Sequence, residues 1–170
     1  MHNRKLNRLP EFDHRSPGYY FVTICVKNFI PYFGDIRNGI MCLNEYGSVI
    51  YDRWKWLEQQ YPYVSIDAVI VMPNHTHAIV CIDDLSVGNV GAGLDLPLRN
   101  TNLPLSNIIG AFKTTSSKEI HNKGLAEFNW QRSFYDVIID NDKSLSKIRN
   151  YITYNPMKWN RDRNKKNMKY

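Results

Sequence analysis

Two apolar segments on either side of Pro73-Asn74 place the tightest constraint on the fold of this chain. Residues 66–72 and 75–82 are short, rich in Val and Ile and separated by a turn signal, which is the pattern of two neighbouring strands. Strand side chains alternate between the faces of a sheet, so His75 and His77 point the same way. The opposite face carries small and apolar residues: Thr76, Ala78, Val80 and Ile82. Two imidazoles side by side on a rigid strand form half of a divalent-metal site.

The periodicity of the remaining sequence predicts an ordered series of strands and helices. We expect strands at 19–26, 66–72, 75–82 and 132–140, a hairpin at 33–43, and helices at 45–60, 105–124 and 143–155. Asn38-Gly39 is the hairpin turn, and Pro62 ends the first helix. Residues 84–104 have no clear period and are expected to form a long mobile loop.

This order predicts an α+β fold. Apart from the hairpin and the last helix, it is the split βαββαβ unit of ferredoxin-like antiparallel sheets. In that architecture both crossover helices cover one face of the sheet. His75 and His77 then stand on the other face, which only the extra C-terminal helix is left to cover. The length fits a single domain over residues 1–170.

Composition limits the cellular compartments and the classes of partner that can be expected for this protein. No apolar run approaches the length of about 20 residues that a membrane span needs, and no apolar segment follows the basic N-terminus. The three cysteines are odd in number and widely spaced, as in core positions of a protein from a reducing compartment. We therefore expect a cytoplasmic protein without a membrane partner.

The formal net charge of +6 attracts polyanions, and nucleic acid is the first candidate. The charge gathers in a basic head, residues 1–18, and a basic tail, residues 158–170. Both segments are expected to be flexible. We expect the protein to associate with the nucleoid, where these segments would contact DNA. Basic termini are as often simply solvated tails.

The C-terminal helix carries residues that complement the histidine pair. Tyr151 and Asn155 are spaced i, i+4 and share a helix face. The amide oxygen of Asn155 could complete a His-His-oxygen site for Mg²⁺ or Mn²⁺. Pro156 disfavours helical backbone at Asn155, which leaves open whether the last turn keeps this spacing. A histidine pair or a lone helical tyrosine also occurs in proteins as ordinary surface or packing residues.

Three ordered motifs resemble one protein family. Met-Pro-Asn-His-Thr-His at 72–77, Trp-Gln-Arg with Phe-Tyr-Asp at 130–136, and Tyr-Ile-x-x-Asn-Pro at 151–156 are similar to those of single-tyrosine HUH transposases. Within these, the chain resembles the REP-associated tyrosine transposases. The family's middle HUH residue is bulky and apolar, whereas this chain has Thr76. Many relatives have a histidine where this chain has Val137.

The resemblance implies a metal-dependent reaction on single-stranded or hairpin DNA. His75, His77 and Asn155 would bind Mg²⁺ or Mn²⁺, which acts on the scissile phosphate as a Lewis acid. Tyr151 would attack the phosphorus, giving a covalent 5′-phosphotyrosine and a free 3′-hydroxyl that can rejoin strands. This is the chemistry of DNA transposition or of a domesticated derivative. Monomeric and homodimeric forms both fit the pattern, with the tyrosine helix acting in cis or in trans.

Further polar and aromatic residues are candidates for DNA contacts. Unpaired bases can stack on aromatic rings, and phosphates pair with basic side chains. The candidates are Lys113, Lys118, Trp130, Gln131, Arg132, Tyr135, Lys147 and Lys158. For Trp130 a core position is the favoured interpretation.

Two other functions remain alternatives. One is a non-catalytic nucleic-acid-binding module whose histidines are the relic of a metal site. The other is a 2H-type phosphoesterase, which shares a His-x-Thr element. That class needs two such elements and this chain has no second one, so it ranks low.

Overall fold

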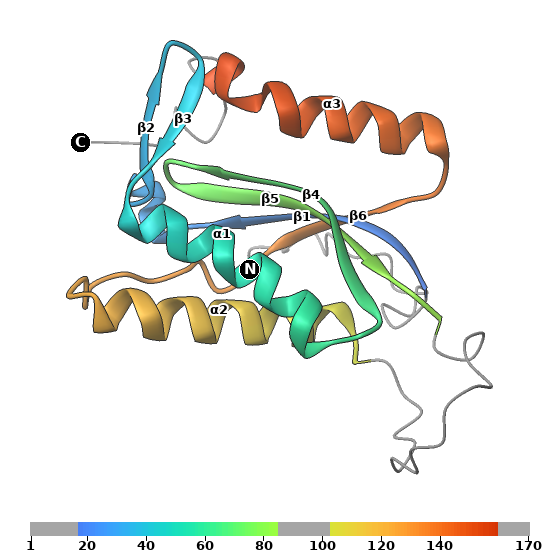
Figure 1. Ribbon diagram of the computed structural model, residues 1–170, viewed down its shortest axis with the longest axis horizontal. Helices are drawn as coiled ribbons and strands as arrows, with labels where there is room; N and C mark the ends of the chain where they lie inside the picture. Colours follow the sequence, from blue (N-terminus) through green and yellow to red (C-terminus); the bar gives the residue numbers. More distant parts are fainter. Residues whose placement is uncertain (1–16, 85–102, 160–170) are drawn as a thin grey trace, which may run out of the picture.

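A four-stranded antiparallel sheet forms the centre of the computed structural model, which describes residues 17–84 and 103–159 (Figure 1). Its strand order is β4-β5-β1-β6. The strands are β1 (Gly18–Cys25), β4 (Val64–Met72), β5 (His75–Ile82) and β6 (Tyr135–Ile139), and the helices are α1 (Glu45–Gln60), α2 (Leu105–Asn122) and α3 (Asp142–Lys158). A hairpin of β2 (Gly34–Arg37) and β3 (Ile40–Leu43) and a short 3₁₀ turn, η1 (Lys27–Phe29), complete the described elements.

The predicted α+β fold with a split βαββαβ sheet is confirmed. Strands β1 and β5 are central and pair antiparallel with each other, β4 pairs with β5, and β6 pairs with β1. Most of the expected loop, most of the basic head and nearly all of the basic tail lie outside the described residues.

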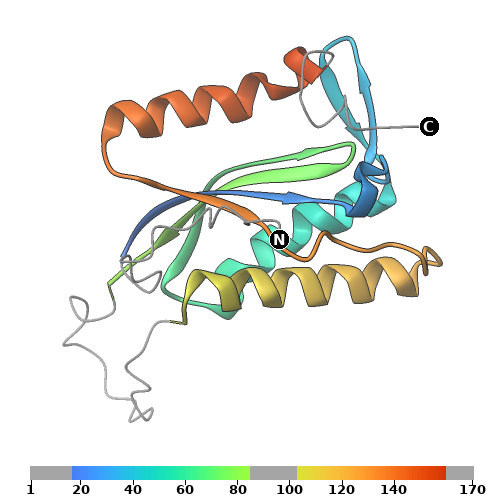
Figure 2. The same ribbon diagram turned by 180° about the vertical axis from the view of Figure 1, so that it is seen from behind.

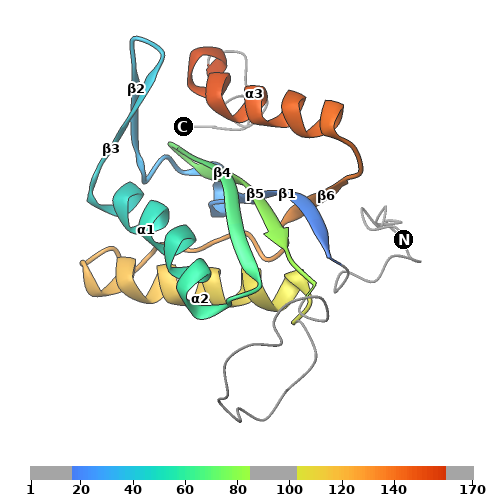
Figure 3. The ribbon, with the colours of Figure 1, turned by 45° about the vertical axis from the view of Figure 1, so that its right-hand side comes forward.

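The sheet has helices on both faces. Figures 1 and 3 show α1 and α2 beneath it and α3 above it, and Figure 2 shows the same layers from behind. The larger apolar core lies between the sheet and α1–α2 and includes Tyr20, Val22, Ile24, Ala78 and Val80. A smaller cluster under α3 joins Ile79, Ile139, Leu145 and Ile152. As expected, α3 covers the face to which the odd-numbered residues of β5 point. Among the described helices, none combines the length and hydropathy needed to cross a bilayer.

Helix α1 forms because a side chain caps its first turn and its apolar residues recur on one face. The side chain of Asn44 caps the first turn by accepting from the backbone N–H groups of residues 46 and 47. Ile50, Trp54 and Leu57 are buried along one face, as the periodicity predicts. The indole of Trp54 donates to Thr76 Oγ1 at 3.0 Å, and this hydroxyl donates in turn to the Ile70 carbonyl. A polar residue between the two histidines is therefore fully hydrogen-bonded on the face away from them.

The hairpin uses the predicted turn. Asn38 and Gly39 have φ of 51° and 76°, the left-handed pair that a two-residue hairpin turn requires. A Cβ at Gly39 would lie 3.3 Å from the Met157 side chain, so the hairpin tip touches the C-terminal end of α3 (Figure 1). The hairpin thus supports the end of the helix that carries the candidate residues.

Two expected boundaries differ from the structure by three residues each, and the others by two or fewer. Strand β6 begins at Tyr135 rather than 132, because the carbonyls of residues 131–133 accept hydrogen bonds from the Lys113 ammonium instead of joining the sheet. Helix α3 continues through Pro156 to Lys158. Ile152, Asn155, Pro156 and Trp159 are all buried, so packing against the sheet outweighs the local preference of the residue before proline.

Candidate active site

His75 and His77 lie at the start of β5 under α3. Both are buried, and their Nε2 atoms are 3.1 Å apart. Two nitrogens that bind one cation at about 2.1 Å must lie within about 4.2 Å of each other, and this pair does. The alternation predicted for the strand is therefore present, and both imidazoles point to one spot.

Each imidazole is held at its other nitrogen. Nδ1 of His75 is 2.8 Å from Asn74 Oδ1, and Nδ1 of His77 is 2.8 Å from Thr23 Oγ1. The Phe21 ring stacks on His77 with ring centroids 5.3 Å apart. Thr23 pairs directly with His77 in the β1–β5 register, which is why its hydroxyl reaches the ring. These contacts fix the directions in which both Nε2 atoms point.

Tyr151 reaches the histidine pair from α3. Its hydroxyl oxygen is 3.4 Å from His77 Nε2, and the two rings lie 5.3 Å apart. Tyr151 is 39 % exposed, so part of the residue faces solvent. The approach occurs within one chain, so no second copy is needed to bring these groups together.

Asn155 lies between two aromatic residues on the same helix face. Tyr151 is one turn before it, and Trp159, one turn after it, stacks over His75 with ring centroids 6.0 Å apart. The i, i+4, i+8 series therefore sets Asn155 above the histidine pair. Its side chain is 2 % exposed, and its Oδ1 has no hydrogen-bond partner among the described residues. A buried amide oxygen without a donor is costly unless a ligand satisfies it.

The residues present fit a divalent cation. Burial lowers the pKa of His75 to about 3, so this imidazole is neutral at physiological pH and can act as a ligand. Within residues 17–84 and 103–159, no three His, Cys, Asp or Glu side chains cluster as a metal site. The candidate site is instead two imidazoles and the orphaned oxygen of Asn155, a mixed N/O set suited to Mn²⁺ or Mg²⁺.

The predicted DNA contacts are dispersed over the molecule. Trp130 is buried against Phe33, Phe112 and Phe128, and its indole donates to Ser116 Oγ at 3.0 Å, so it belongs to the core as favoured. Lys147 and Lys158 are exposed on α3, whereas Lys118 is exposed on α2 across the sheet from the histidines. Tyr135, 46 % exposed, pairs with Thr23 and so lies on the histidine face at the sheet edge.

Lys113 has a structural environment. Its ammonium donates to the carbonyls of Gln131, Arg132 and Ser133 at 2.8, 3.3 and 3.3 Å, and burial lowers its pKa. These bonds hold the segment before β6 in its bent path.

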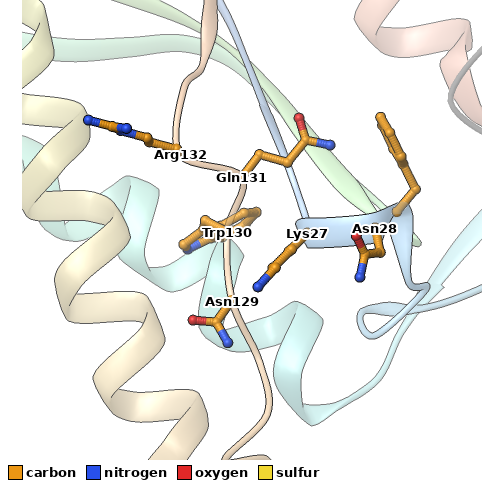
Figure 4. A pocket seen from close by; sticks show the side chains of 7 residues that line it. Lys27, Asn28, Asn129, Trp130, Gln131 and Arg132 are labelled. Atoms are coloured by element: carbon orange, nitrogen blue, oxygen red, sulfur yellow. The ribbon is translucent and has the colours of Figure 1, made fainter.

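Gln131 and Arg132 line an open pocket of about 730 Å³ (Figure 4). Residues of η1 form one side of it and residues 129–132 the other. Lys27 and Arg132 supply positive charge, and no carboxylate is among the described lining residues. The pocket borders the site, because the Asn74 side chain donates to the Phe29 carbonyl of η1 at 2.9 Å while contacting His75.

The sequence patterns did not identify three residues of the candidate site: Thr23, Asn74 and Trp159. The i, i+8 spacing from Tyr151 to Trp159 is a signal that could have found the tryptophan. Asn74 directly precedes His75, but adjacency in the sequence does not show that the Asn74 side chain contacts the His75 ring. Thr23 depends on the strand register, which no local pattern gives.

Comparisons with known proteins identify relatives in sequence and in fold. No protein-family model matches the chain. An uncharacterized protein of Haemophilus influenzae is 36 % identical over 169 residues, which cover 95 % of this chain and 93 % of that protein. A second H. influenzae protein, named "Putative REP-associated tyrosine transposase", is 24 % identical over 157 residues, 86 % of this chain and 74 % of its own length.

Two solved structures share the fold. A REP-associated tyrosine transposase bound to a REP hairpin superposes with a TM-score of 0.54 at 21 % identity, covering 89 % of this chain and 74 % of that one. A protein described as a putative transposase from Deinococcus radiodurans gives 0.50 at 14 % identity, covering 81 % and 90 %. In sequence and in fold, the chain is therefore similar to REP-associated tyrosine transposases, as its motifs predict.

Proposed function

We propose that this protein nicks and rejoins single-stranded or hairpin DNA through Tyr151, with Mg²⁺ or Mn²⁺ held by His75, His77 and Asn155. The family relation gives the chain a transposase-like role in DNA processing. The observation that carries the finer proposal is the approach of the Tyr151 hydroxyl to within 3.4 Å of His77 Nε2 in one chain.

Residues of this chain supply the nucleophile of the proposed reaction and orient it. The Tyr151 oxygen forms a bond to phosphorus while the bond to the 3′ oxygen breaks, leaving a 5′-phosphotyrosine and a 3′-hydroxyl. The proton that the phenol loses is balanced by the proton that the leaving oxygen gains. His77 and Phe21 flank the phenol ring and fix its direction. When bound, the cation would supply Lewis-acid stabilisation of the phosphate charge.

Charge and shape support DNA as the substrate. The chain carries a net charge of +6, and the open pocket beside the site has two cationic side chains. The solved relative was bound to a REP hairpin, which supports hairpin DNA as the ligand here. Tyr135 and Lys147 lie on the histidine side of the sheet, where they could contact unpaired nucleotides next to the cleaved phosphate.

The test uses a hairpin oligonucleotide with single-stranded flanks, built from palindromes in the neighbourhood of the gene. With Mn²⁺, the native chain should give a protein–DNA adduct that survives denaturing electrophoresis, and EDTA should abolish it. Tyr151→Phe should form no adduct. Tyr154→Phe is the matched control, since Tyr154 lies three residues further along α3 and is 50 % exposed.

The outcomes separate the alternatives. An adduct that persists in Tyr151→Phe would sink the assignment of the nucleophile. A native chain that binds the hairpin tightly yet gives no adduct with either cation would favour the non-catalytic nucleic-acid-binding module.

A further inference from the structure

We propose that Asn74 and Thr23 are positioning residues that set the tautomers of the two imidazoles: Asn74 holds His75 permanently ready for a cation, and Thr23 lets His77 change tautomer when the cation arrives. The inference rests on the cation proposed above. Its starting point is the hydrogen bonds of the two imidazoles and of the Asn74 amide, each between named atoms. The Tyr151 hydroxyl, 3.4 Å from His77 Nε2, can accept from a proton on that nitrogen as well.

The orientation of the Asn74 amide is fixed by its second partner. The Phe29 carbonyl can only accept, so the amide nitrogen must face it, at 2.9 Å. The amide oxygen then faces Nδ1 of His75 at 2.8 Å, and that nitrogen must carry the proton. Nε2 of His75 is therefore left with its lone pair, which is the form that binds a metal ion.

The Phe29 carbonyl is itself held in place. Asn28 and Phe29 both adopt left-handed backbone, with φ of 59° and 56°, which is uncommon for residues other than glycine. Val26 accepts from the Phe29 N–H at 3.0 Å and donates to the Asn74 carbonyl at 2.9 Å. Asn74 is thus tied to this turn through both its side chain and its backbone.

His77 needs the opposite tautomer in the absence of a cation. Its Nε2 lies 3.1 Å from the lone pair of His75 Nε2, and two lone pairs at that distance repel each other. A proton on His77 Nε2 makes the contact a hydrogen bond. Nδ1 of His77 is then an acceptor, and the Thr23 hydroxyl donates to it over 2.8 Å.

If His75 and His77 hold a cation, the tautomer of His77 would be the reverse of this one. The proton leaves His77 Nε2 through solvent and an equivalent proton returns to Nδ1, so both rings stay neutral and no net proton is released. The Thr23 hydroxyl turns and accepts from Nδ1. A threonine hydroxyl can donate or accept, whereas valine of the same shape can do neither.

The experiment uses the full chain with ¹⁵N-labelled histidine. In EDTA, long-range ¹H–¹⁵N spectra should show His75 protonated at Nδ1 and His77 at Nε2. Saturating Mg²⁺ should move the His77 proton to Nδ1 and leave His75 unchanged. Thr23→Val should lower Mn²⁺ affinity about ten- to hundredfold, and Thr23→Ser should restore it.

The possible failures are distinguishable. A proton on Nε2 of His75 in EDTA overturns the role of Asn74 without any cation present. Native Mn²⁺ affinity in Thr23→Val, or an unchanged His77 tautomer with Mg²⁺ bound, overturns the role of Thr23 but leaves the proposed function standing. A native chain that binds neither cation overturns the proposed metal and the exchange at His77 together. Near-UV circular dichroism of each variant shows that the fold is kept.

Discussion

Arg149 and Asp67 join α3 to β4 through two parallel hydrogen bonds, Nε to Oδ2 at 2.8 Å and Nη2 to Oδ1 at 2.5 Å. Asp67 falls where the β4–β5 register shifts between Ile66 and Ala68, and such a bulge re-aims a side chain. The pair lies half a turn before Tyr151 on the helix. It therefore helps to hold the candidate nucleophile over the histidines of its own chain.

Arg149→Gln is expected to slow adduct formation more than it weakens hairpin binding. The helix would dock less firmly, and a small displacement of a reacting group costs up to about a hundredfold in rate. We expect a loss of about tenfold, measured as the rate of adduct formation at saturating DNA. The charge reversal Arg149→Asp with Asp67→Arg should recover part of the rate. Equal rates in Arg149→Gln and native protein would contradict the role of the pair.

Thr76→Val should destabilise the protein without touching cation binding. The Trp54 indole is fully buried and would lose its acceptor, which costs about 1–3 kcal/mol. Urea unfolding measures this loss, and Mn²⁺ affinity should stay native because Thr76 faces away from the histidines. In Trp54→Phe the donor is absent, so adding Thr76→Val should cost less than in the native background. Additive losses would show that the hydrogen bond contributes nothing.

Lys113 and Lys118 are predicted to behave differently although both lie on α2. Lys113→Met removes a charged donor from three carbonyls and should lower the unfolding free energy by about 1.5–3 kcal/mol. Lys118→Met should leave stability within about 0.5 kcal/mol. If Lys118 contacts a phosphate, its loss reduces the salt dependence of hairpin binding by about one unit of slope. Urea titrations and binding at several salt concentrations separate the two roles, and the reverse pattern would contradict this assignment.

Local patterns predicted the elements of this fold because each is specified within a few residues. Asn38-Gly39 fixes the hairpin turn, and the spacing of Ile50, Trp54 and Leu57 fixes the buried face of α1. The boundaries that differed depend on distant residues. Strand β6 is shortened by Lys113 on α2, and α3 passes Pro156 because the residues around it are buried against the sheet.

In the candidate site, too, some features follow from local sequence patterns and others depend on distant residues. The facing of His75 and His77 follows from alternation, and the alignment of Tyr151 with Asn155 follows from the helical repeat. The hydrogen-bond partners of the two imidazoles follow neither from the strand alternation nor from the helical repeat. Thr23 lies 54 positions from His77, and only the register of β1 against β5 brings the hydroxyl to the ring.

Asn155→Leu offers the sharpest separation of stability from cation binding. In EDTA the variant should be as stable as the native chain or more stable. It replaces a buried oxygen, which finds no donor among residues 17–84 and 103–159, with an apolar group of similar shape. Its Mn²⁺ affinity should fall at least about tenfold, since the third ligand is gone. Urea unfolding in EDTA and titration calorimetry with Mn²⁺ measure the two effects. Asn155→Asp is the control that keeps the ligand oxygen, and its affinity should equal or exceed the native value. A leucine variant that binds Mn²⁺ normally would remove Asn155 from the site and leave its buried oxygen unexplained.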